Sequence, residues 1–76
     1  MKRPTVFQLN LLMQFPRDGS YISRWRINNP STHEVADSKH FERLILKGYI
    51  TEHAIHGWMF RLTDEAIEYL NGVKIK

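Results

Sequence analysis

The chain has 76 residues, of which 42% are hydrophobic and 25% charged, a balance typical of one small globular domain and not of a disordered or fibrous chain. It contains no cysteine, which excludes disulfides and thiolate metal sites as sources of stability, so the core and any partner subunit must supply it. The longest uncharged run, residues 4–16, is too short to span a bilayer and lacks a secretory cleavage pattern. We therefore expect a cytoplasmic protein, and Met1 suggests a complete small gene product.

The net charge of +3 is unevenly distributed along the chain. Residues 1–26 carry five Lys or Arg side chains and one Asp, whereas residues 31–70 carry four basic side chains and seven carboxylates. We expect a polyanion to be attracted only moderately, and from particular faces of the molecule.

The first predicted element is a helix over residues 6–15, capped by Thr5 and stopped by Pro16. Its apolar side chains form two faces at helical spacing. One face comprises Val6, Leu9, Leu12 and Met13, and the other comprises Phe7, Leu11 and Phe15. Two interpretations of the second face stay open, since a central helix can be buried on both sides or can pair with a second copy of the chain.

A turn and an alternating segment follow the first helix. In "PRDG" we expect Gly19 to take a positive φ. The segment "SYISRWRI", residues 20–27, alternates like a half-buried strand, with Arg24 and Arg26 on its outer face. A short helix is the rival interpretation, because the stretch is brief and Arg is a good helix former. The following "NNP" is predicted to be a loop.

The second predicted helix covers residues 31–47. Ser31 is followed three residues later by Glu34, which is the pattern of a capping box. Its apolar ridge comprises Phe41, Leu44 and Ile45. Val35 lies off this ridge, so a kink or two short helices meeting near Asp37 stays open. Gly48 is expected to end the helix in the left-handed conformation.

A hairpin and a third helix complete the chain. The runs "YITEHAI" and "WMFRL" are strand-like and are joined around His56-Gly57, where Gly57 is expected to take the positive φ of a hairpin turn. Thr63 is expected to cap the last helix, whose first turn is acidic. Its inward face is predicted to comprise Ala66, Ile67 and Leu70, and Asn71-Gly72 is predicted to end it.

The order helix, strand, helix, hairpin, helix resembles a winged helix-turn-helix domain. "FERLILKGYI" is similar to the end of the recognition helix in bacterial winged-helix regulators, and "FRLTDEAIEYL" is similar to their return strand and following helix, as in MarR-like and PadR-like proteins. The resemblance implies a single α+β domain over residues 1–76, with three helices, a small antiparallel sheet and a hairpin wing. It also implies a small bacterial or phage transcriptional regulator that binds duplex DNA and acts as a dimer.

Under this resemblance, helix 31–47 would enter the major groove, with basic side chains neutralising phosphates on either side. The expected DNA-binding residues are Arg24, Arg26, Thr32, His33, Ser38, Lys39, Glu42 and Arg43. The alternative for all of them is an ordinary solvated surface. The residues expected to contact a second copy or another protein are Phe7, Leu11, Phe15, Ile55 and Trp58.

The hairpin weakens the case for DNA contact by the wing, because no Lys or Arg lies between Lys47 and Arg61. A second function therefore stays open, namely a protein-interaction module or inhibitor that uses the acidic helix face and Trp58. His53 and His56 have a spacing that a metal site can use, but without cysteine we expect no metal. No phosphate-binding loop or nucleophile grouping indicates an enzyme or a cofactor.

Overall fold

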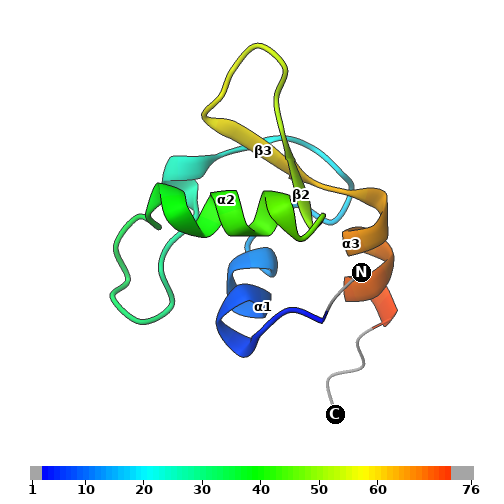
Figure 1. Ribbon diagram of the computed structural model, residues 1–76, viewed down its shortest axis with the longest axis horizontal. Coiled ribbons are helices and arrows are strands. Elements are labelled where there is room, and N and C mark those ends of the chain that lie inside the picture. The colour runs from blue at the N-terminus through cyan, green and yellow to red at the C-terminus, as the bar shows by residue number, and fades with distance from the viewer. Residues whose placement is uncertain (1–2, 73–76) are drawn as a thin grey trace.

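The computed structural model describes residues 3–72 as an α+β fold with three α-helices and one small antiparallel sheet (Figure 1). This confirms the predicted class. In chain order the elements are α1 (Val6–Leu12), β1 (Ile22–Ser23), the 3₁₀ turn η1 (Arg24–Arg26), α2 (Ser38–Leu46), β2 (Ile50–Glu52), β3 (Met59–Leu62) and α3 (Asp64–Gly72).

The sheet has the strand order β1-β3-β2, and both pairings are antiparallel. Ile22 lies opposite Phe60 on one side of β3, and Ile50 lies opposite Leu62 on the other. Helix α2 packs on this sheet through Phe41, whose ring stacks on that of Phe60 with centroids 4.9 Å apart. The core between the helices and the sheet comprises Leu11, Leu12, Phe15, Ile27, Ala36, Phe41, Leu44, Tyr49, Ile50, Phe60, Leu62, Ala66 and Leu70.

Helix α1 begins as predicted but ends early. Thr5 accepts a hydrogen bond from the Gln8 amide, and the Gln8 side chain accepts one from the Thr5 amide, which completes a capping box. The helix ends at Leu12 and not at Phe15. In the next turn the amides of Gln14 and Phe15 donate to carbonyls three residues back instead of four, and the side-chain amide of Gln14 pairs with both the N–H and the C=O of Asn28 at 2.8 Å.

Both interpretations of residues 20–27 were partly right. Only Ile22–Ser23 is strand, and Ser23 then accepts a hydrogen bond from the Trp25 amide and starts the 3₁₀ turn. The side chains of Tyr21 and Trp25 are exposed, although alternation placed them on the inner face of a longer strand. The turn ends the alternation, because its residues no longer point to opposite faces of a sheet.

The predicted helix start at Ser31 is wrong. Residues 31–37 form a loop, and α2 begins at Ser38 with Asp37 in the cap position but without a side-chain cap bond. The segment after Ile27 folds back on itself instead, with Asn29 N–H donating to Glu34 O and Ala36 N–H donating to Ile27 O. These bonds occupy backbone groups that a helix would need, so the Ser31 and Glu34 pattern forms no capping box.

The turn at the end of α2 and the cap of α3 confirm the local predictions, whereas the hairpin differs. Gly48 has φ +82° after the helix, and Thr63 accepts a hydrogen bond from the Ala66 amide at the start of α3. Gly57 does not have a positive φ. The strands are instead joined by a longer loop, residues 53–58, in which Nδ1 of His53 accepts hydrogen bonds from two backbone amides.

Candidate functional site

Helix α2 carries half of the residues expected to bind DNA. Phe41 and Leu44 are buried against the core, so the opposite face of the helix is exposed. That outer face comprises Lys39, Glu42, Arg43 and Leu46. Leu46 is 86% exposed, the most of any large apolar residue in the described chain. The predicted ridge was therefore right for Phe41 and Leu44, whereas Ile45 is exposed at the edge of the outer face.

The basic side chains of this face form no ion pair with any residue that the structure describes. Within residues 3–72, neither Lys39 nor Arg43 lies within 4.0 Å of a carboxylate. The two residues are four positions apart on α2, and such positions lie on the same side of a helix. Both cations are therefore available to an anion in solution.

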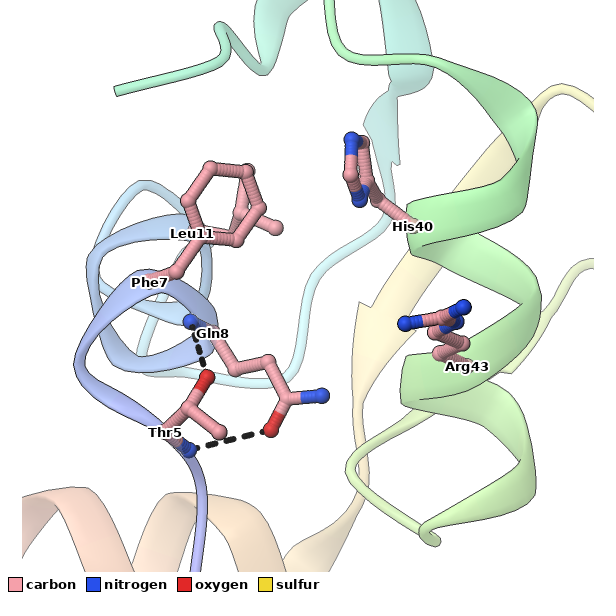
Figure 2. Close-up of a pocket in the computed structure, with 6 residues that line it drawn as sticks. All are labelled: Thr5, Phe7, Gln8, Leu11, His40 and Arg43. Carbon is pink, nitrogen blue, oxygen red and sulfur yellow. Dashed lines mark hydrogen bonds between the residues drawn. The ribbon is translucent and has the colours of Figure 1, made fainter. Parts of the chain in front are cut away.

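Arg43 also borders a cleft of about 260 Å³ between α2 and α1 (Figure 2). Arg43 and His40 project from α2 toward Phe7 and Gln8 of α1, and the rings of Phe7 and His40 are 4.9 Å apart. Nζ of Lys47 donates to the side-chain oxygen of Gln8 at 2.8 Å. These contacts join the N-terminal part of α1 to α2 and fix the direction in which α2 faces solvent.

Arg24 lies at the other edge of α2. Its guanidinium carbon is 5.5 Å from the ring centroid of Phe41 and 5.9 Å from that of Trp25. Its Nε is buried and makes no hydrogen bond within the described part of the chain. The residue borders a groove of about 220 Å³ whose lining includes Ser38 and Glu42 of α2 and Glu52 of β2. Arg26, the next basic residue of η1, is exposed.

Thr32 and His33 are the two expected DNA-binding residues that the structure removes from the helix. They lie in the loop before α2, where the amide of His33 donates to Asn29 O and the hydroxyl of Thr32 accepts from the Glu34 amide. His33 has φ +64°. Figure 1 shows this loop projecting beside the N-terminal end of α2, so both residues belong to a loop next to the helix and not to the helix itself.

The residues expected to contact a partner divide into two groups. Leu11 and Phe15 are 1% and 3% exposed, so the interpretation of their face as a dimer contact is wrong and the buried-helix interpretation holds for them. Phe7 is half-buried against the core. Ile55 and Trp58, in contrast, are 82% and 41% exposed in the hairpin loop, where a partner can reach them.

The hairpin loop brings together aromatic rings that are far apart in the sequence. The ring of Trp58 lies 5.7 Å from that of Trp25 and 5.3 Å from that of His56. His56 is 5.0 Å from His53, which in turn is 4.6 Å from Tyr21. We call these five side chains the aromatic row. Sequence reasoning found Trp58 but missed Tyr21 and Trp25, because it assigned both to the inner face of a strand.

Two pKa shifts are found outside the helix face and the aromatic row. Hydrogen bonds from the hydroxyl and the amide of Ser20 hold the pKa of Asp18 below its usual value. Burial, followed by the charge of Tyr69, raises the pKa of Tyr49. Neither residue contributes to the surfaces described above.

Among residues 3–72, no three His, Cys, Asp or Glu side chains are grouped so that they could hold a metal ion. No helix in the same part of the chain has both the length and the apolar character needed to cross a bilayer. No family model, curated protein or solved structure matches the chain.

Proposed function

We propose that the chain is a small winged-helix DNA-binding protein, a transcriptional regulator whose helix α2 enters the major groove of duplex DNA. The element order and the sheet order β1-β3-β2 support this proposal, since α2 is followed directly by a hairpin that belongs to the sheet beneath it. In this assignment η1 stands where the first helix of a helix-turn-helix pair would be, and residues 53–58 are the tip of the wing.

The observation that carries the proposal is the outer face of α2. Lys39 and Arg43 are both exposed on a helix that is held on the core by Phe41 and Leu44, and Arg43 lies at the side of the face that borders the cleft with α1. An α-helix with its side chains is about 10 to 12 Å in diameter, which matches a major groove about 12 Å wide. Cations without carboxylate partners bind phosphates without first breaking an ion pair.

The remaining residues of the face have roles in the same proposal. We assign to Glu42 a hydrogen bond from the N4 amino group of cytosine, and to the exposed Leu46 a contact with a thymine methyl group. We assign to Arg26 a backbone phosphate beside the groove. Thr32 and His33 are assigned to the flank of the interface, because their loop lies beside the start of α2.

The test is a titration of labelled duplex DNA at several salt concentrations between about 50 and about 200 mM. We expect the logarithm of the association constant to fall linearly with the logarithm of the salt concentration. The double variant Lys39→Ala/Arg43→Ala should bind more weakly, and its slope should flatten by about 0.9 for each phosphate that the protein no longer neutralises. Arg17→Ala is the matched control, because Arg17 is exposed but lies outside α2 and η1.

Two results would refute the proposal. One is an affinity for duplex DNA that is undetectable, or independent of salt, at low ionic strength. The other is a double variant that retains the slope of the parent, because α2 would then neutralise no phosphate.

A further inference from the structure

We propose that the aromatic row is a second nucleic-acid site, which stacks the unpaired bases of a single strand. The row comprises Tyr21, Trp25, His53, His56 and Trp58. This goes beyond the duplex-binding role proposed for α2 and does not depend on it, because the row is formed by residues 21–25 and the hairpin loop, residues 53–58.

The exposure of the tryptophans is the first observation. The core stacks Phe41 on Phe60 in its interior, yet Trp25 and Trp58 are 57% and 41% exposed. Two large rings side by side on the surface of so small a domain form an exposed apolar patch. Their tilt of 40° leaves ring surface open to solvent instead of closing the pair face to face.

The second observation is the charge around the row. The guanidinium carbon of Arg61 lies 5.8 Å from the ring centroid of Tyr21 at one end, and that of Arg24 lies 5.9 Å from Trp25 at the other. Arg26 is exposed on the same 3₁₀ turn as Trp25. A line of rings with arginines at both ends is complementary to a chain that alternates flat apolar groups with negative charges.

The exposed rings and the arginines at both ends of the row together favour a single-stranded nucleic acid as the ligand. A single strand offers a base for each ring and a phosphate for each cation, whereas the base faces of a duplex are already stacked on each other. An acidic peptide supplies the charge but has no aromatic group at every position. The four ring-to-ring distances, 4.6 to 5.7 Å, keep the rings of the row in one continuous surface.

Binding at this site can be followed by the intrinsic fluorescence of the protein. Its two tryptophans are both in the row, so the intrinsic tryptophan fluorescence reports on the row alone. We expect an oligothymidylate of about 12 nucleotides to quench this fluorescence to saturation, and the affinity to fall as salt is added.

Variants are best compared by the anisotropy of a labelled oligothymidylate, because each substitution of a tryptophan removes part of the intrinsic signal. Trp25→Ala and Trp58→Ala should each weaken binding by about 5- to 100-fold. Trp58→Phe should recover most of the loss, since phenylalanine keeps a stacking ring. Val6→Ala is the matched control, because Val6 is an exposed apolar residue on α1, outside both proposed sites, and its truncation should leave the affinity unchanged. Circular dichroism confirms that each variant is folded.

Three outcomes would overturn the inference. Equal binding of an abasic oligomer of the same length would mean that the surface attracts charge and does not stack bases. Loss of oligothymidylate binding in Lys39→Ala/Arg43→Ala, with no loss in the tryptophan variants, would assign the single strand to α2. No quenching at low salt would leave the exposed tryptophans to a protein partner. None of these outcomes bears on duplex binding by α2, which has its own salt titration.

Discussion

The two capping patterns of the sequence should differ measurably in their contribution to stability. Thr5 and Gln8 exchange hydrogen bonds of 3.1 and 3.0 Å at the start of α1, and Gln8 also accepts from Lys47 at 2.8 Å. Thr5→Ala should lower the free energy of unfolding by about 1 kcal/mol, the usual loss for a cap. Gln8→Ala should lower it by about 1 to 2 kcal/mol, because its bond to the Lys47 ammonium is removed as well. Ser31→Ala and Glu34→Ala should stay within about 0.5 kcal/mol of the parent.

These differences in the free energy of unfolding are measured by urea unfolding followed by circular dichroism. Thermal unfolding is the check, because a loss of about 1 kcal/mol lowers the thermal midpoint by about 4 to 8 °C in a domain of this size. The double variant Thr5→Ala/Gln8→Ala should lose less than the sum of the single losses, because the two residues share one hydrogen-bonded box. A loss for Ser31→Ala or Glu34→Ala as large as that for Thr5→Ala would refute the reasoning, since it would place a capped helix start at Ser31.

Three further predictions test other parts of the fold. Gly48→Ala should lower the free energy of unfolding in urea by about 1 to 2 kcal/mol because Gly48 has a φ of +82°, although the added Cβ would meet no atom within 4 Å. Gly57→Ala should leave that free energy unchanged or raise it by up to about 1 kcal/mol. Equal losses in the two variants would contradict the two backbone conformations. Gln14→Glu should be less stable than the parent at neutral pH, because its carboxylate would face the Asn28 carbonyl. The variant should regain part of this stability in acid, where the protonated carboxyl group can donate a hydrogen bond. A stability difference that is independent of pH would contradict the contact with Asn28. Burial raises the pKa of Tyr49, so the stability that its protonated form contributes is complete below its ordinary pKa of about 10 and is lost as the pH rises through the raised value. The tyrosinate absorbance of this residue should therefore rise together with unfolding. Complete ionisation of all tyrosines while the chain stays folded would contradict this prediction.

The features that the sequence predicted correctly depend on neighbours in the chain. The caps by Thr5 and Thr63 need only a hydroxyl at a fixed distance from an amide along the backbone. The left-handed Gly48 likewise follows from the end of an apolar helical period and the absence of a Cβ. Such local patterns persist when the chain folds, because the distant partners of these side chains, the Lys47 ammonium for Gln8 and the Gly48 carbonyl for Thr63, bond to them without displacing the caps.

The segment before α2 shows why other predictions were wrong. Ser31 and Glu34 have the spacing of a capping box, but the side chain of Asn29 accepts from the amides of Ser31 and Thr32 at 2.8 and 3.3 Å. The backbone of Asn29 also donates to Glu34 O at 2.7 Å. This turn competes with a helix for the same backbone groups. Burial of Ala36 and Ile27 in the core then favours the loop, and burial at that distance is not visible in a local pattern.

The candidate sites depend on tertiary structure to different degrees. Lys39 and Arg43 were predicted as outward residues, because the helical period through Phe41 and Leu44 already defines the outer face of α2. The aromatic row depends on the contact between Trp25 and Trp58, which lie 33 positions apart in the sequence. No periodicity relates such positions, so nothing in the order of residues indicates that the two tryptophans meet.

The contact between Trp25 and Trp58 also bears on the absence of Lys and Arg from the hairpin loop, because it brings η1 and its arginines beside that loop. Between Lys47 and Arg61 the chain has no Lys or Arg, which argued against a nucleic-acid role for the wing. In the folded chain, Arg24 lies beside Trp25 at one end of the row, and Arg61 lies beside Tyr21 at the other. Phosphates respond to charges near them in space and not to charges near them in sequence. The hairpin loop has no Lys or Arg of its own, yet η1 supplies Arg24 and Arg26 and β3 supplies Arg61 around its rings, and this is the arrangement on which the proposed single-strand site depends.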